Sequence, residues 1–480
     1  MKYVSTRGSA PDLSFCDVLL TGLARDGGLY VPETWPTLSG ETISSFAGQG
    51  YATVAKTVLW PFVDGEIARD VFETMVDDAY ATFRHPAVTP LVQVGPKDFV
   101  LELFHGPTLA FKDVAMQLLA RMMDHELAER GERANIVGAT SGDTGGAAID
   151  AFRGRERTDV FILFPNGRVS PVQRRQMTTI PPEFAESGKH NNVQALAIDG
   201  NFDDCQALVK AMFNDFNFRD GVHLSGVNSI NWGRIMAQVV YYFTAAASLG
   251  AHIKTSGHKV SFSVPTGNFG DIFAGFVAQK MGLPMKKLIV ATNRNDILAR
   301  CLNTGRYEKM GVEATISPSM DIEISSNFER LLFEVSGRDG GAVTQMMARL
   351  TQSGAFDIEA EALAQIREDF AAGRCDEAQT AKLIKDAWSD AAYLLDPHTA
   401  VGLHVAREHA APDEGITVTL GTAHPAKFPA AVEAASGIAP PLPEWLGDLM
   451  DREEKFSVLP NDLDALEAHI RSHSRAASVE

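Results

Sequence analysis

Residues 135–146 read Asn135-Ile136-Val137-Gly138-Ala139-Thr140-Ser141-Gly142-Asp143-Thr144-Gly145-Gly146, and they decide the fold class of the chain. The β-branched beginning predicts a strand at residues 135–138, and the glycine-rich turn after it leads into a helix. The N–H groups of such a turn can hold a carboxylate or a phosphate at the helix N-terminus. The turn is neither a Walker A loop nor the dinucleotide fingerprint Gly-x-Gly-x-x-Gly. A tight turn capped by Asp143 would explain the same residues without a ligand.

Further short aliphatic runs outside this stretch alternate with longer helical patterns. Such alternation is typical of stacked βα units around a mainly parallel sheet. The sequence therefore predicts an α/β fold, in which ligands bind beyond the carboxyl ends of the strands. The other predicted strands are residues 100–103, 160–164, 193–198, 260–264, 288–291 and 416–420.

The domain organisation is predicted from changes in the same patterns. Residues 303–390 are charged and show helical spacing without a strand run, which predicts a helical insertion. The last residues include Ser472-His473-Ser474-Arg475, which we expect to be a frayed tail. The expected parts are residues 1–95 as an N-terminal segment, 96–302 with 391–440 as the α/β lobes, 303–390 as the helical insertion and 441–480 as a C-terminal extension.

The composition and charge limit the classes of partner. The chain has 480 residues, of which 45% are hydrophobic and 22% charged, and this excludes a mostly disordered, collagenous or coiled-coil protein. Its 43 basic and 61 acidic side chains give a net charge of −18, which disfavours nucleic acid and anionic membranes as partners. No signal-peptide pattern and no run of about 18 apolar residues occurs, so we expect a cytoplasmic protein.

Cysteine and histidine spacing predicts neither a disulfide framework nor a metal site. The cysteines Cys16, Cys205, Cys301 and Cys375 lie far apart, and none belongs to a Cys-x-x-Cys pair. We therefore expect reduced thiols. No His-Glu-x-x-His or similar helical pair is present, so no metal is expected.

A lysine at a predicted strand-to-helix junction is the first candidate catalytic group. The junction reads Phe104-His105-Gly106-Pro107-Thr108-Leu109-Ala110-Phe111-Lys112-Asp113 and places Lys112 beside Phe111 at the start of a helix. Burial and the positive end of the helix dipole both lower the pKa of such an amine, which favours Schiff-base chemistry. An exposed lysine on a first helical turn is the simpler alternative, because most lysines lie at the surface.

Three further stretches carry side chains suited to anions. One follows a predicted strand and reads Ser263-Val264-Pro265-Thr266-Gly267-Asn268-Phe269-Gly270-Asp271, whose glycines let the backbone close around a phosphate. Another reads Thr419-Leu420-Gly421-Thr422-Ala423-His424-Pro425-Ala426-Lys427-Phe428 and combines a hydroxyl, an imidazole and an amine. The third stretch reads Asn228-Ser229-Ile230-Asn231-Trp232-Gly233-Arg234. Its side chains Ser229, Asn231 and Arg234 could face one oxyanion. Turns and helix caps would explain each of these stretches on its own. A reactive lysine together with two anion-binding loops in one chain favours a pyridoxal phosphate site.

Motifs in a specific order link these stretches to a known family. They are Asp26-Gly27-Gly28-Leu29-Tyr30-Val31-Pro32, His105-Gly106-Pro107-Thr108, Phe111-Lys112-Asp113, Thr140-Ser141-Gly142-Asp143-Thr144-Gly145, Gly267-Asn268-Phe269-Gly270-Asp271 and Thr422-Ala423-His424-Pro425-Ala426-Lys427-Phe428. In this order they closely resemble the threonine synthase family, in its bacterial and fungal branch. The resemblance covers about residues 1–440.

This resemblance implies a fold, a reaction and roles for residues. The fold is type II of the pyridoxal phosphate enzymes, with the cofactor between two α/β lobes. The reaction, the last step of threonine biosynthesis, is that of a lyase converting O-phospho-L-homoserine and water to L-threonine and phosphate. Lys112 is the implied catalytic and Schiff-base lysine. The other implied cofactor residues are Phe111, Asp113, Gly267, Asn268, Phe269, Gly270 and Thr422, and the substrate residues are Thr140, Ser141, Asp143, Thr144, Ser229, Asn231, Arg234 and Lys427.

Several alternatives stay open at the level of sequence. Threonine dehydratase and the β-subunit of tryptophan synthase share the lysine and the glycine loop but need no second anion pocket, so Ser229, Asn231 and Arg234 argue against them. A related phospholyase would share every motif and differ only in its product. A noncatalytic binding protein has no use for Lys112, and a dehydrogenase needs the absent dinucleotide fingerprint. The resemblance also implies a monomer.

Overall fold

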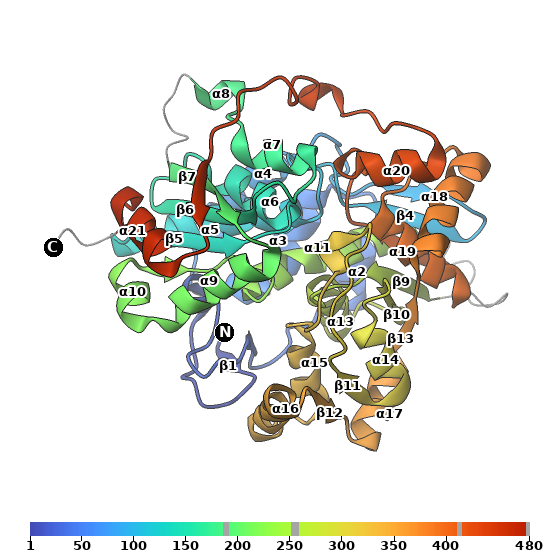
Figure 1. Ribbon diagram of the computed structural model, residues 1–480. Helices are drawn as coiled ribbons and strands as arrows, with labels where there is room; N and C mark the ends of the chain where they lie inside the picture. The colour runs from blue at the N-terminus through green and yellow to red at the C-terminus, as the bar shows by residue number, and fades with distance from the viewer. Residues whose placement is uncertain (186–191, 251–258, 410–414, 477–480) are drawn as a thin grey trace.

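Two mainly parallel sheets form the centre of the molecule, and helices cover them (Figure 1). The computed structural model describes residues 1–185, 192–250, 259–409 and 415–476. The chain passes between the two sheets more than once, so that each lobe contains segments distant in sequence. This topology places the carboxyl ends of strands from both sheets around one cavity.

The first sheet has five parallel strands in the order β15-β7-β6-β5-β8. Its middle strands, β5 (Ala134–Ala139) and β6 (Thr158–Pro165), are almost entirely buried, because helices cover both faces of the sheet. The other strands are β7 (Val193–Asp199), β8 (Leu224–Ser225) and β15 (Ser457–Pro460), and the helices of this lobe are α6 (Asp143–Phe152), α7 (Pro171–Thr178), α8 (Pro182–Ala185), α9 (Phe202–Asn214), α10 (Phe216–Gly221) and α21 (Leu463–His473).

The second sheet has six strands in the order β13-β10-β9-β14-β4-β3, and only β3 is antiparallel. Its central strands, β9 (Val260–Pro265) and β14 (Thr417–Gly421), are buried along their whole length. The other strands are β3 (Leu91–Gln93), β4 (Asp98–Glu102), β10 (Met285–Thr292) and β13 (Phe370–Arg374), and the helices of this lobe are α13 (Gly270–Lys280), α14 (Ile297–Thr304), α18 (Glu377–Ala391), α19 (Pro397–Glu408) and α20 (Pro429–Ser436).

Two long buried helices, α5 (Lys112–Arg130) and α11 (Trp232–Ser248), carry the chain between the sheets. The N-terminal segment packs on them and shares one hydrophobic core with both lobes. In this core the rings of Tyr3 and Trp232 lie 5.9 Å apart. The segment contains β1 (Tyr3–Ser5), α1 (Phe15–Thr21), β2 (Tyr30–Pro32), α2 (Gly40–Ser45), α3 (Tyr51–Val63) and α4 (Arg69–Tyr80).

All seven strands predicted at residues 100–103, 135–138, 160–164, 193–198, 260–264, 288–291 and 416–420 are confirmed, with ends that differ by a few residues. The expectation that residues 303–390 contain no strand is wrong. This stretch contains β11 (Arg306–Glu308), α15 (Phe328–Val335), α16 (Gly340–Ser353), β12 (Ala355–Asp357) and α17 (Ala360–Asp369), and its β13 pairs with β10 at the edge of the second sheet. Strand β13 reads Phe-Ala-Ala-Gly-Arg, a composition with little strand preference, so its conformation depends on that pairing.

The expectation of a frayed tail at residues 472–475 is also wrong. Helix α21 continues to His473, and Asn135 Nδ2 donates to Ser474 Oγ at 2.7 Å. Arg475 Nε donates to the Asp159 carboxylate at 2.7 Å. Figure 1 shows the segment after α20 crossing the top of the molecule to reach β15 and α21 beside the first sheet. Residues 477–480 lie outside the described part of the chain.

Candidate active site

A cavity of about 820 Å³ lies where strands of the two sheets end. Its walls come from the turns after β5, β9 and β14, from the start of α5, and from the loop at residues 311–326. The structure brings most of the predicted residues to this cavity. Those that line it are Phe111, Lys112, Thr140, Ser141, Asp143, Thr144, Ser229, Arg234, Gly267, Asn268, Gly270 and Thr422.

Lys112 is the first residue of α5, and its side chain is buried. Its Nζ lies 3.2 Å from Asp143 Oδ2 and 4.7 Å from the centre of the Phe111 ring. Burial lowers the pKa of Lys112, and the charges of Arg234 and Lys427 lower it further, against the opposing effect of Asp143. The amine therefore loses its proton more readily than an exposed lysine does.

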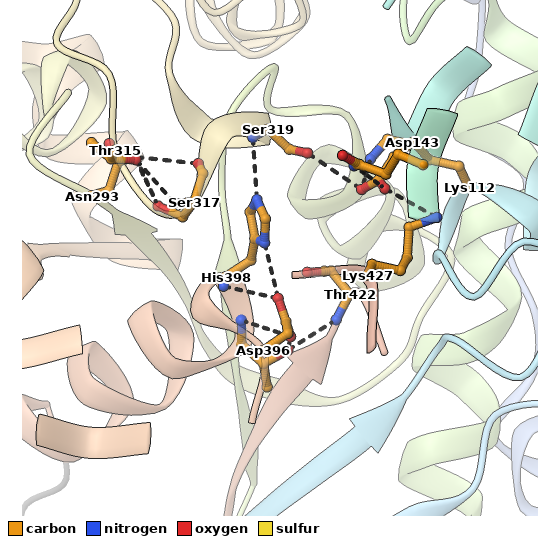
Figure 2. A network of polar contacts seen from close by, with 12 residues as sticks. Lys112, Asp143, Asn293, Thr315, Ser317, Ser319, Asp396, His398, Thr422 and Lys427 are labelled. Carbon is orange, nitrogen blue, oxygen red and sulfur yellow. Dashed lines mark hydrogen bonds and ion pairs between the residues drawn. The ribbon is translucent and has the colours of Figure 1, made fainter. Parts of the chain in front are cut away.

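Asp143, the first residue of α6, is the centre of a polar network at this lysine (Figure 2). Besides Lys112, its carboxylate contacts Lys427 Nζ at 3.2 Å and accepts hydrogen bonds from Gln173 at 2.9 Å and Ser319 at 3.3 Å. Burial alone would raise the pKa of Asp143, but the charges of Lys112 and Lys427 outweigh it and hold that pKa well below its usual range. The carboxylate therefore remains charged and can fix the position of the amine.

A second chain of contacts leads from Asp143 to the opposite wall (Figure 2). The backbone N–H of Ser319 donates to His398 Nε2 at 3.2 Å, and His398 Nδ1 lies 2.9 Å from Asp396 Oδ1. Since the buried Asp396 carboxylate only accepts, Nδ1 of the imidazole must donate to it, which leaves Nε2 as the acceptor for Ser319. Sequence reasoning missed Ser319, His398 and Asp396, because no motif connects residues so far apart. The Asp396 cap before Pro397 is the one local signal that could have pointed to them.

The turn between β9 and α13 forms an anion cradle. Phe269 adopts the left-handed conformation with φ 62°, and α13 begins at the next residue, Gly270. The carbonyls of Gly267 and Asn268 accept hydrogen bonds from Ser325 and Asn327 and are thus turned away from the helix start. The first N–H groups of a helix have no partner within it, so they can bind a phosphate here. A Cβ at Gly267 would lie 2.7 Å from the carbonyl oxygen of Ser319, so only glycine fits.

Arg234 supplies a cationic wall to the same cavity. It is almost fully buried, and burial lowers the pKa of its guanidinium to about 10. Its Nη1 makes one long hydrogen bond of 3.4 Å to the carbonyl of Val227, and its Nε has no partner among the described residues. A buried guanidinium with free donors is suited to an anionic ligand.

Thr422 closes the cavity at the end of β14. Its backbone N–H donates to Thr399 Oγ1 at 3.3 Å, and Thr399 is itself bound to Asp396. The backbone of Thr422 is thereby held by a buried network of hydrogen bonds that ends at the Asp396 carboxylate.

Four predicted site residues are absent from the cavity lining, although the backbone of Phe269 belongs to the turn that forms the cradle. Both carboxylate oxygens of Asp113 accept from Thr108, and Asn231 caps α11 and holds the carbonyl of Leu19. Phe269 packs between Phe328 and Phe370 in the core. Lys427 is completely buried and is bound to Thr108, Gln176 and Asp143. Their side chains shape the site from outside it.

No group of His, Cys, Asp and Glu side chains suited to hold a metal is found in the described ranges. In the same ranges, the helices are too short or too polar to cross a membrane. The donor set of the cavity is instead an amine, N–H groups and a guanidinium, and it fits a phosphorylated aldehyde cofactor that an amine can bind.

The fold and this site define a pyridoxal-phosphate-dependent enzyme of fold type II. Residues 83–353 match the family described as "Pyridoxal-phosphate dependent enzyme". Residues 2–80 match "Threonine synthase N terminus", and residues 399–470 match "Threonine synthase, C-terminal". The chain belongs to the threonine synthase family.

Individual relatives are similar in sequence to this chain over nearly its whole length. A threonine synthase of Pseudomonas aeruginosa is 52% identical over 98% of both chains. A crystal structure of a threonine synthase from Brucella melitensis with PLP bound is 63% identical, with a TM-score of 0.94 over 99% of this chain and 100% of that one. The yeast threonine synthase structure is 39% identical, with a TM-score of 0.90 over 98% of each chain. The family resemblance, the fold class and the cofactor inferred from the sequence are thereby confirmed.

Proposed function

We propose that this lyase converts O-phospho-L-homoserine and water to L-threonine and phosphate. The observation that carries the proposal is the buried Lys112 amine, which shares one cavity with two separate anion-binding groups, the cradle at residues 267–270 and Arg234. A cofactor phosphate and a substrate phosphate require two such groups. The turn after β5 can receive the substrate carboxylate, so an enzyme that acts on an unphosphorylated amino acid would have no use for Arg234 as a further anion-binding group.

Pyridoxal phosphate, when bound, supplies an aldehyde for Schiff-base formation and a conjugated ring that stabilises negative charge on substrate carbons. The N–H groups at residues 267–270 would hold its phosphate, Lys112 Nζ its aldehyde carbon and Thr422 its ring nitrogen. These roles use the start of α13, the start of α5 and the end of β14. The three elements come from distant parts of the sequence and are held together by the second sheet and the helix packing around it.

Lys112 Nζ moves the protons in this proposal. Its lowered pKa lets the neutral amine take a proton from substrate Cα, give that proton up within the site, and then take one from Cβ, so that the γ-phosphate leaves with the electrons of its bond. One proton returns to Cγ and one to Cα, while water adds its hydroxyl at Cβ and its remaining proton goes to the released phosphate. Asp143 holds Nζ toward the cavity through its 3.2 Å contact.

The substrate would lie between the turn after β5 and Arg234. The side chains of Thr140, Ser141 and Thr144 at the start of α6 line the wall that would receive the substrate carboxylate. Ser229 and Arg234 line the wall that would bind its phosphate. The anionic ends of the substrate then hold the reacting carbons in front of Lys112.

The proposed activity also implies an oligomeric state, a cellular location and a class of partner. We expect the chain to act as a monomer in the cytoplasm, on a small molecule and without nucleic acid or membrane. We also retain the division into residues 1–95, 96–302 with 391–440, 303–390 and 441–480, although the third part contributes β13 to the second sheet.

The deciding experiment is an incubation of the purified protein with pyridoxal phosphate and O-phospho-L-homoserine, in which phosphate and threonine are both assayed. Equal amounts of the two products support the proposal. Phosphate released together with a 2-oxo acid would make the protein a phospholyase. Visible absorbance of bound cofactor without either product would require a different amino-acid substrate.

A further inference from the structure

Arg330, on α15, connects three segments that are far apart in the sequence. Its side chain is completely buried. Its Nε donates to the carbonyl of Tyr30 at 3.1 Å, in β2 of the N-terminal segment. Its Nη2 donates to the carbonyl of Ile230 at 2.7 Å, and its Nη1 donates to Asn327 Oδ1. A planar guanidinium can fix acceptors in three directions at once, whereas a lysine offers a single ammonium group.

Asn327 transmits this connection to the cradle between β9 and α13. Its backbone N–H and its Nδ2 both donate to the carbonyl of Asn268, at 3.1 and 2.9 Å. Its Nδ2 also lies 3.4 Å from the place that a Cβ would take at Gly270. Two hydrogen bonds to one carbonyl fix the orientation of that peptide, and therefore the direction in which the following N–H groups point.

Several links join the N-terminal segment to α15, among them a hydrogen bond from Trp35 Nε1 to Glu334 Oε2 at 3.1 Å, and two of them use neighbouring residues of the helix, Glu329 and Arg330. In one link, Thr6 Oγ1 and Arg7 bind the carboxylate of Glu329, at 2.6 and 3.0 Å. That link involves neither Asn327 nor residues 267–270. Only the link through Tyr30 and Arg330 continues to the cradle, and it also reaches Ile230, which adjoins Ser229.

We infer that Arg330 is a positioning residue through which the N-terminal segment forms part of the binding site for the cofactor phosphate. It acts through Asn327 and touches neither cofactor nor substrate. The inference rests on the proposed placement of the cofactor phosphate at residues 267–270. It assigns a function to a segment that contributes no residue to the cavity lining.

The test compares the affinity of the apoprotein for pyridoxal phosphate and for pyridoxal, which lacks the phosphate. Both aldehydes are titrated into the wild type, Arg330→Met and Arg330→Lys, and binding is followed by visible absorbance. We expect both substitutions to weaken pyridoxal phosphate binding about tenfold or more, as for loss of charge-assisted hydrogen bonds, with little change for pyridoxal. A merely structural defect would weaken both aldehydes alike, and that result, or an unchanged ratio of affinities, would overturn the inference.

Two further variants distinguish a wrong role for Arg330 from a wrong placement of the cofactor phosphate. Glu329→Gln weakens the neighbouring link between the same segments, and it should leave the ratio of the two affinities at the wild-type value. Gly267→Ala places a Cβ against the Ser319 carbonyl and should abolish the preference for the phosphate. If Gly267→Ala keeps that preference, the placement of the phosphate is wrong. If Gly267→Ala loses it and the Arg330 variants do not, only the role of Arg330 is wrong. Should Arg330→Met fail to fold, Arg330→Lys and Asn327→Ala provide the same comparison.

Discussion

At the scale of single residues, Lys112 is a buried amine whose charge depends on its neighbours. Burial and Arg234 favour the neutral form, and Asp143 at 3.2 Å favours the ammonium ion. The amine must be neutral to attack an aldehyde and to act as a base. The charge of Lys112 therefore depends on a balance between burial, which favours the neutral amine, and the Asp143 carboxylate, which favours the ammonium ion. The loss of Arg234 or Asp143 should change the pKa of this amine more than it changes the stability of the fold.

We predict that Lys112→Ala abolishes turnover and leaves the fold intact. The proposed reaction uses this amine to form the Schiff base and to move the protons, whereas Lys427 remains to pair with the Asp143 carboxylate. Threonine formation measured alongside circular dichroism tests this prediction. Threonine produced by the purified Lys112→Ala protein at a rate near that of the wild type would show that another residue is the base.

Arg234→Ala is predicted to weaken binding of the phosphorylated substrate by about 2–4 kcal/mol, as for the loss of a charge-assisted contact in a buried site. The effect should appear mainly in KM. Its Nε has no protein partner in the described chain, so its removal breaks few contacts within the protein. Gln238→Ala, a change to a neutral cavity residue, is the matched control. An unchanged KM would place the substrate phosphate elsewhere.

At the scale of elements, the start of α5 is held by a carboxylate that does not reach the cavity. The backbone N–H and Oγ1 of Thr108 donate to Asp113 at 2.8 and 2.6 Å, which joins the preceding loop to the helix that carries Lys112. Burial, together with the charge of Asp150, raises the pKa of Asp113 to about 7. The element that presents the reactive amine therefore contains a group that titrates near neutral pH.

This titration predicts a pH dependence of stability. The pKa of Asp113 is about 7 in the folded protein and about 3.9 in an unfolded chain, so the folded state binds more protons between these values. Its contribution to the free energy of unfolding is fully present below about pH 4 and is lost as the pH rises through about 7.

The substitution Asp113→Asn removes the charge and keeps an acceptor for Thr108. At pH 8 it should raise the free energy of unfolding by up to about 4 kcal/mol, since each pKa unit corresponds to ~1.4 kcal/mol. At pH 4 it should have little effect. Urea unfolding at both pH values measures the difference, and an equal change at the two values would contradict the assignment.

At the scale of the whole molecule, the C-terminal extension joins the two lobes. It leaves α20 beside the second sheet and adds β15 and α21 to the first (Figure 1). Leu466 and Ile470 of α21 are completely buried in the core on that side. The extension is therefore part of the tertiary structure, and we expect it to contribute to global stability.

Leu466→Ala is predicted to lower the free energy of unfolding by about 2–4 kcal/mol, the usual cost of a cavity left by a buried leucine. Ser472→Ala, an exposed position on the same helix, should change it by less than about 0.5 kcal/mol. Thermal and urea unfolding of both variants test the prediction. Equal stability of the two proteins would mean that α21 separates from the lobe before it unfolds.

Sequence patterns were informative where the signal is local and failed where it is not. The strands at the centres of both sheets were predictable, because they are continuous aliphatic runs between turns. The edge strands β13 and β15 were not, because they are short and mixed in composition, and pairing with a neighbour determines their conformation. In the site, Lys112, the turn at residues 140–144 and the cradle at residues 267–270 all carry local glycine and hydroxyl signatures.

Amino-acid order alone was sufficient for the α/β class, the family and the reactive lysine, since each depends on contiguous residues and on turn chemistry. The surroundings of these groups depended on tertiary packing. The placement of Lys427 behind Asp143, the contacts from Ser319 to Asp396, and the bonds of Arg330 all join residues separated by long stretches of chain. Those contacts exist only after the sheets and helices bring the segments together, because hydrogen bonds and burial act over a few ångströms of space regardless of distance along the chain.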